Sequence, residues 1–84
     1  MKKNFPIIFC INLDRRIDRW NDMKRQFEEN NLTYYRFTAV DGKKAFQNVE
    51  DDYKKGWLAC FASHIKLIQK IINENIEEAI ILED

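Results

Sequence analysis

Three short apolar segments, each followed directly by polar or charged residues, most constrain how this chain can fold. Residues 7–11 and 79–82 are continuously apolar and rich in β-branched side chains. Such runs are typical of strands covered on both faces, as in a parallel sheet. Residues 34–39 are aromatic-rich and partly alternating, and Asp41 and Gly42 follow them with turn chemistry. Three strands are therefore predicted.

Residues 15–30 have the spacing of an amphipathic helix. Asp14 is expected to cap the N-terminus of this helix, and Asn30 and Asn31 to end it. Apolar side chains at intervals of three, three and four predict one helical face. These side chains are Ile17, Trp20, Met23 and Phe27.

A second and stronger helical pattern covers residues 57–75. Its apolar positions repeat at intervals of three and four, and they are Leu58, Phe61, Ile65, Ile68 and Ile72. Residues 43–56 are polar and are predicted to form a surface loop with a short helical turn at 46–53. Core packing is predicted for the aromatic side chains of Trp20, Tyr34, Phe37, Trp57 and Phe61.

The element order β-α-β-α-β predicts an α/β fold with a parallel sheet and right-handed crossovers, built as one domain. With 84 residues, such a domain buries only roughly 60% of its unfolded surface and would be marginally stable alone. The 14 basic and 14 acidic side chains give no net charge. Nucleic acid is therefore not an expected partner. No signal peptide or membrane span is expected, and any membrane contact would be peripheral.

The cysteines and the single histidine carry no recognisable catalytic or metal pattern. Cys10 and Cys60 are far apart and lack a CxxC spacing, which argues against a zinc site or a disulfide framework. Both are predicted to be small buried side chains, and a reducing, cytoplasmic setting is expected. His64 follows Ser63 on the second predicted helix, where a packed structural histidine is the simplest interpretation. Adjacent residues of one helix do not form a catalytic triad.

Polar motifs follow all three predicted strands, and ligands of open parallel sheets gather at this edge. After the first strand, Arg15 and Arg16 could meet a nucleotide diphosphate together with free helix N–H groups. The alternative is a solvated helix face with Arg15–Asp18 and Arg19–Asp22 ion pairs. Asp41 could bind a ribose or base, or serve only the turn.

Glu83 and Asp84 follow the third strand. Carboxylate oxygens suit Mg²⁺ or Mn²⁺, which usually add substrate phosphate oxygens to one or two carboxylates. Such a cation would stabilise the charge on a departing nucleoside diphosphate. The alternative is a solvated strand end without a ligand.

Four motifs in this order resemble glycosyltransferase family 25. They are residues 11–16 with Asp18, Arg19 and Met23, then residues 36–42, 60–64 and 79–84. The family includes lipopolysaccharide and lipooligosaccharide glycosyltransferases and the related collagen galactosyltransferases. The resemblance implies that residues 1–84 are the Rossmann-like, nucleotide-sugar-binding N-terminal part of a GT-A type fold, truncated at the acidic metal motif.

The resemblance also implies a UDP-sugar donor, often UDP-galactose, and a divalent metal, usually Mn²⁺, with Mg²⁺ as the alternative. The full enzyme would transfer a hexose to a lipopolysaccharide, a lipooligosaccharide or another surface glycan, in the cytoplasm or at the inner face of its membrane. Glu83 and Asp84 match the opening of the metal motif, and no catalytic residue is identified. Ala59 departs from the family, which more often has glycine there. The residues expected near the donor are Asn12, Asp14, Arg15, Arg16, Asp41, Ser63 and His64.

Two other hypotheses remain open at this point. The chain could be a non-catalytic, truncated remnant that at most binds nucleotide, and the isolated 84 residues are expected to be inactive in either case. It could also be an unrelated small α/β binding module of the receiver type. A receiver would carry an acidic pair directly after its first strand, whereas arginines follow this one.

Overall fold

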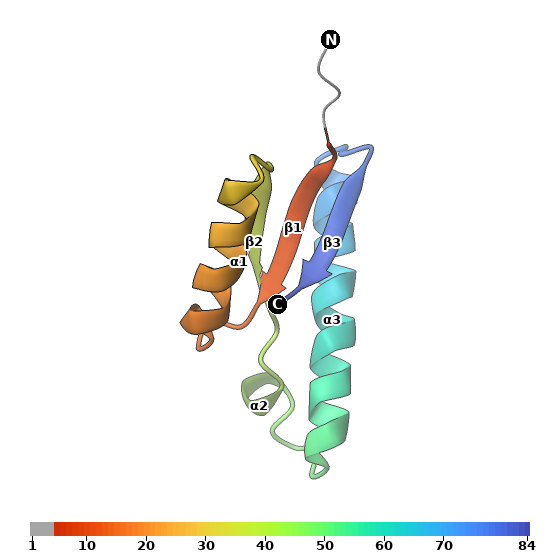
Figure 1. The fold of residues 1–84 in the computed structure, drawn as a ribbon. Helices are drawn as coiled ribbons and strands as arrows, with labels where there is room; N and C mark the ends of the chain where they lie inside the picture. The colour runs from red at the N-terminus through yellow and green to blue at the C-terminus, as the bar shows by residue number, and fades with distance from the viewer. Residues whose placement is uncertain (1–4) are drawn as a thin grey trace.

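The apolar segment predicted as the first strand lies at the centre of the sheet. In the computed structural model, which describes residues 5–84, strand β1 (Ile7–Asn12) pairs in parallel with both other strands. These are β2 (Tyr34–Thr38) and β3 (Ala79–Glu83), in the order β2-β1-β3 (Figure 1). The three strands and their parallel pairing are thus confirmed. Residues 1–4 of the predicted unit lie outside the described part.

Helix α1 (Ile17–Glu29) covers one face of this sheet. Ile8 and Cys10 point to this face from β1 and pack with Phe27 of the helix. Alternate side chains of a strand point to opposite faces, so this contact uses only every second residue of β1. The partly buried side chains packed around it are Trp20, Met23, Leu32, Tyr34, Ile80 and Leu82.

Helix α3 (Asp52–Asn73) covers the opposite face, where Phe9 and Ile11 of β1 pack with Leu67. The connection from β1 to β2 and that from β2 to β3 run in opposite directions across the sheet. Two right-handed crossovers in opposite directions place their helices on opposite faces, as seen here. The α/β class and the order of the main elements are confirmed.

The start of α1 differs from the prediction. The helix begins after Arg16, whose side chain makes no capping hydrogen bond. The prediction that Asp14 caps the helix is wrong, because its carboxylate instead accepts a hydrogen bond from Arg36 at 2.7 Å. The predicted end is correct: Asn30 is the C-cap, and Asn31 has a positive φ of 55°.

One helix begins directly before the segment predicted as a loop, and a second begins within it. The short helix α2 (Gly42–Ala45) begins after Asp41, whose side chain accepts a hydrogen bond from the Lys43 amide. Helix α3 begins at Asp52 rather than at residue 57, because Asp51 caps it in the same way. Aspartate is a favourable N-cap. The apolar spacing used for the prediction starts only after this polar first turn.

The buried face of α3 is not the one that the large apolar residues predict. The positions facing the sheet are Ala59, Ser63 and Leu67, whereas Phe61 is 58% exposed and Ile72 is 66% exposed. Two small residues at these positions let the helix lie close to the sheet. The predicted core packing is therefore wrong for Trp57 and Phe61, which are exposed, and correct for Trp20, Tyr34 and Phe37, which pack against the two clusters. Within residues 5–84, no helix is long and apolar enough to cross a bilayer.

Gly42 allows the loop after β2 to lie directly against α3. A Cβ atom at this position would lie 2.6 Å from the carbonyl oxygen of Lys55 and 3.2 Å from the Cβ of Ala59. The first distance is too short for any side chain, and the obstacle is backbone. Gly42 therefore serves a close approach between two elements in addition to the turn inferred from its sequence.

We expect Gly42→Ala to lower the free energy of unfolding by about 1–3 kcal/mol, the usual cost of overpacking. Gly56→Ala is a matched control, because a Cβ there would meet nothing within 4 Å. It lies within α3 and should raise the free energy of unfolding by about 0.4–1 kcal/mol. Urea unfolding followed by circular dichroism measures both, and equal effects would show that the contact with Lys55 is unimportant.

Candidate functional site

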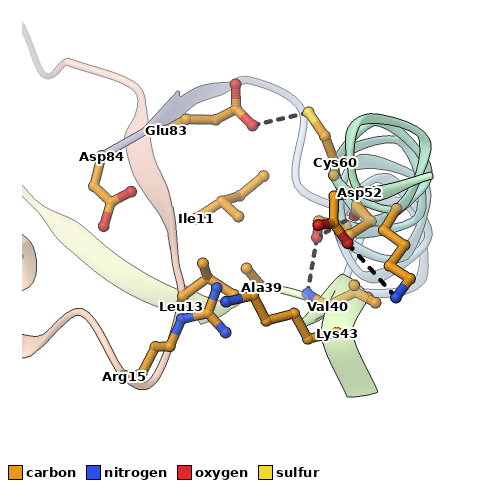
Figure 2. A pocket seen from close by; sticks show the side chains of 15 residues that line it. Ile11, Leu13, Arg15, Ala39, Val40, Lys43, Asp52, Cys60, Glu83 and Asp84 are labelled. Atoms are coloured by element: carbon orange, nitrogen blue, oxygen red, sulfur yellow. Dashed lines mark hydrogen bonds and ion pairs between the residues drawn. The ribbon is translucent and has the colours of Figure 1, made fainter. Parts of the chain in front are cut away.

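A pocket of about 440 Å³ opens at the carboxyl edge of the sheet. It lies between the ends of β1 and β3, the segment after β2, and the N-terminal half of α3 (Figure 2). In a sheet of order β2-β1-β3, the connections leave the carboxyl edge in opposite directions at the point between β1 and β3. Ligands of such sheets usually bind at this point. The charged residues of its lining are Arg15, Lys43, Lys55, Asp52, Glu83 and Asp84.

Arg15 and Asp41 join the loops that follow β1 and β2. The Arg15 guanidinium donates to the Asp41 carboxylate at 2.5 Å, and its side chain remains 47% exposed. Partial burial opposes the charge on Asp41, yet the hydrogen bonds from Arg15 and the Lys43 amide lower the pKa of this carboxyl below its ordinary 3.8. These two predicted site residues are thus brought together, and Arg15 is the one that lines the pocket.

The local ion pairs expected for a solvated helix face do not form as predicted. Asp18 is paired with Arg16 at 3.1 Å, not with Arg15. Asp22 is paired with Arg25 at 2.6 Å, not with Arg19. Arg16 also lies outside the pocket lining, and its backbone carbonyl accepts from Asn12. The two neighbouring arginines therefore have different surroundings, and only Arg15 faces the pocket.

Asn12 links three segments of the chain at this edge. It is only 1% exposed, and its Oδ1 accepts from Arg36 Nε at 2.9 Å. Its Nδ2 donates to the carbonyl of Arg16 at 3.2 Å and to the carboxylate of Asp84. Since its amide is fully used inside the protein, Asn12 positions its neighbours and presents no free group to a ligand.

Arg36 was missed by the sequence analysis as a member of the site. Its guanidinium donates to Asn12 and to Asp14, and it lies 6.0 Å from the centre of the Trp20 ring. Asp14 is 74% exposed and lies outside the pocket lining. The only available signal was a charged residue within an otherwise aromatic strand, which pointed to a polar partner at the neighbouring strand end.

Lys43 and Lys55 were also missed, because both lie in the segment predicted as a loop. Both line the pocket, as Arg15 does. The signal that could have found them is the pair of aspartates that cap α2 and α3. These caps fix the two helix starts from which the lysines project.

Ser63 is a structural link between the loop after β2 and α3. Its hydroxyl donates to the carbonyl of Ala59 at 2.7 Å and accepts from the Val40 amide at 2.9 Å. The residue is buried, although it contributes to the pocket lining. Its oxygen is therefore engaged, and no base is bound to it. Ser63 shapes the pocket wall rather than acting as a nucleophile.

The predicted metal residues Glu83 and Asp84 both line the pocket but make different contacts (Figure 2). Glu83 accepts from the Cys60 thiol at 3.0 Å and lies 3.5 Å from Nε2 of His64. Asp84 accepts from Asn12 instead. Both groups are oxygen donors of the type that Mg²⁺ and Mn²⁺ prefer, so the composition of this wall fits such a cation.

The two cysteines differ in their surroundings. Cys10 is buried, as predicted, and burial raises the pKa of its thiol to about 11. Cys60 is exposed, so the prediction that it is buried is wrong. It projects from α3 beside the pocket, where its hydrogen bond to Glu83 raises the pKa of the thiol above its ordinary value. A cysteine placed next to a carboxylate and a histidine is a potential ligand group, unlike the one in the core.

Comparison with known proteins adds evidence on the family. The family model described as Glycosyltransferase family 25 (LPS biosynthesis protein) matches residues 5–84. A Glycosyltransferase 25 family member of Aedes aegypti is 35% identical, over 92% of this chain and 16% of that protein. Procollagen galactosyltransferase 2 of Homo sapiens is 34% identical, over 99% of this chain and 16% of that protein.

Procollagen galactosyltransferase 1 of Danio rerio is 32% identical, over 99% of this chain and 17% of that protein. The chain thus spans about a sixth of the length of these relatives. No solved structure matches it. The match covers every strand and helix described above and the whole pocket lining.

We expect Asn12→Leu to lower the free energy of unfolding by about 1–3 kcal/mol, because it leaves buried polar partners without their hydrogen bonds. Asp14→Asn is the control, since it weakens the exposed side of the same Arg36 network and should cost at most about 1 kcal/mol. Urea unfolding of both variants measures the difference. A loss for Asp14→Asn as large as that for Asn12→Leu would contradict the central role of the buried amide.

The Arg15–Asp41 pair also predicts a pH dependence. A carboxyl whose folded pKa is lowered stabilises the fold above its unfolded pKa, and this stabilisation is lost as the pH falls through the folded value. Arg15→Gln should raise the pKa of Asp41 toward its ordinary value and make acid unfolding start at higher pH. NMR titration of the Asp41 carboxyl carbon measures the pKa directly. Arg25→Gln, which removes an arginine far from Asp41, should leave that titration unchanged.

Proposed function

Because the chain belongs to glycosyltransferase family 25, we propose that it carries the donor site of an enzyme that transfers a hexose from a nucleotide sugar to a glycan. The observation that carries the proposal is the pocket at the carboxyl edge of the sheet. It places Arg15, Lys43 and Lys55 near the carboxylates of Glu83 and Asp84. Cationic side chains together with metal-type carboxylates are the combination that a sugar diphosphate and its cation require.

The basic residues would bind the diphosphate. A guanidinium can hold two phosphate oxygens at once, whereas a lysine acts as a flexible point charge. Arg15 is suited to this because about half of its side chain remains exposed while Asp41 holds it in place. Lys43 and Lys55, which line the same pocket, would add positive charge. In the proposal, Asp41 orients Arg15 and would also accept a hydrogen bond from the ribose or base.

Glu83 and Asp84 would hold the divalent cation, Mn²⁺ or Mg²⁺. When bound, such a cation neutralises charge on the diphosphate as the sugar departs. Asn12 holds the Asp84 carboxylate through its buried amide, and an outer hydrogen bond of this kind orients a metal ligand and strengthens its binding. The proposal extends to a GT-A type arrangement, in which the β2-β1-β3 sheet forms the nucleotide-binding part.

The donor and acceptor are the finer part of the proposal. We propose UDP-galactose as donor, since relatives over nearly the whole chain carry the name galactosyltransferase. The description of the family model supports a lipopolysaccharide, a lipooligosaccharide or another surface glycan as acceptor. The free thiols of Cys10 and Cys60 suit a reducing compartment, which supports a cytoplasmic reaction. The residues that bind the acceptor are not assigned to this chain.

The proposal is tested by calorimetric titration of UDP into the chain, with and without Mn²⁺. We expect binding that is stronger with the cation. Arg15→Gln should weaken it roughly tenfold or more, because a hydrogen bond to a charged group is worth about 1.5–3 kcal/mol.

Arg25→Gln is the matched control, since this arginine lies on α1 and its ion pairs within residues 5–84 are with Asp22 and Glu29. It removes the same charge and should leave the affinity unchanged. If a folded chain binds no UDP, or if both arginine variants weaken binding equally, the donor site is not built as proposed.

A further inference from the structure

Three side chains of different chemistry converge beside the pocket. Cys60 and His64 lie one turn apart on the same side of α3, and Glu83 reaches them from the end of β3. The Cys60 sulfur is 3.0 Å from Glu83 Oε1, and His64 Nε2 is 3.5 Å from the same oxygen. All three ligand atoms lie within 4.8 Å of one another. Within residues 5–84, this is the cluster in which three histidine, cysteine or acidic side chains bring their ligand atoms close enough to hold one metal ion.

These separations are close to those around one small cation. Zinc binds sulfur at about 2.3 Å, and imidazole nitrogen and carboxylate oxygen at about 2.0–2.2 Å. Ligand atoms of a tetrahedron with such bond lengths lie roughly 3.3–3.8 Å apart. The three ligand atoms would have to move closer than the observed 4.8 Å limit by side-chain rotation, which the exposure of Cys60 and Glu83 permits.

We propose that Cys60, His64 and Glu83 form a zinc site whose fourth position is open to solvent. Three protein ligands with an open fourth position are the usual arrangement of a zinc that can accept a further ligand. A thiolate and an imidazole favour Zn²⁺, whereas Mg²⁺ and Mn²⁺ favour oxygen donors. Binding replaces the thiol proton of Cys60 by the metal, and the proton leaves to solvent. The site requires no nucleotide and does not rest on the proposed transfer reaction.

The cysteine spacing gave no indication of this site. Spacing rules detect zinc sites whose ligands come in close sequence pairs, and here one ligand lies about twenty residues from the other two. The parallel sheet brings that ligand close. β3 lies next to β1, and α3 covers the face of the sheet to which Glu83 points. Cys60 and His64 are four residues apart, a spacing that places both on one helical face.

The test uses Co²⁺ as a spectroscopic substitute for zinc, added to the reduced 84-residue chain without nucleotide. We expect one Co²⁺ per chain, with a thiolate-to-cobalt charge-transfer band and the visible bands of tetrahedral cobalt. Zn²⁺ should displace the cobalt and abolish both signals. It should also raise the midpoint of thermal unfolding, because a ligand that binds only the folded state stabilises it.

Three variants assign the ligands. Cys60→Ser should abolish the charge-transfer band although the buried Cys10 remains, which makes that thiol an internal control. His64→Gln and Glu83→Gln should each weaken zinc binding by more than the roughly 10–100-fold cost of losing an outer-shell partner. Glu78→Gln removes an exposed carboxylate outside the cluster and should change nothing.

Circular dichroism of each variant measures whether the fold is kept, and the exposure of the substituted side chains favours this outcome. The proposal is overturned if the wild-type chain gives no thiolate band with Co²⁺. It is also overturned if Cys60→Ser keeps that band, or if zinc binds the His64 and Glu83 variants as tightly as the wild type.

Discussion

The buried amide of Asn12 is the interaction on which this edge of the sheet depends. It lies at the end of the central strand and contacts the start of α1, Arg36 of β2 and the carboxylate of Asp84 after β3. A buried polar group is costly unless all its hydrogen bonds are made, so these four segments keep one relative placement. Because the pocket lies at the same edge, the placement of its walls follows from the same contacts.

Much of the fold could be predicted because its signals are local. The continuous apolar run of β1 requires cover on both faces, and this alone indicates a central strand of a parallel sheet. The side of α1 that carries Trp20, Met23 and Phe27 was also correctly predicted, because the other residues of that helix are almost all polar. Ile17, predicted on the same face, is 64% exposed, so that part of the prediction is wrong. When one face of a helix is apolar and the rest is charged, the spacing of the apolar residues identifies a single face that can be buried.

The orientation of α3 and the contacts of the site could not be predicted in this way. α3 carries large apolar residues on one side and Ala59, Ser63 and Leu67 on another, and the second side faces the sheet. The spacing of apolar residues predicts that the side with the larger side chains is buried. The close approach of helix and sheet, in which the Val40 amide donates a hydrogen bond to Ser63, instead requires the side with the smaller ones. The pairing of Arg15 with Asp41 likewise joins residues that only the sheet brings together.

The two carboxylates at the end of β3 are held in different ways, which gives them different chemistry. Asp84 accepts from a buried amide that is itself fixed by three segments, so it keeps one orientation and still has free lone pairs for a cation. Glu83 is more exposed and accepts from a neutral thiol, a weak donor. It can therefore leave that partner at little cost. A cation that prefers oxygen would draw Glu83 toward Asp84, whereas one that prefers sulfur would keep it beside Cys60 and His64. In the two proposals, Glu83 is thus the residue whose position decides which cation would be bound.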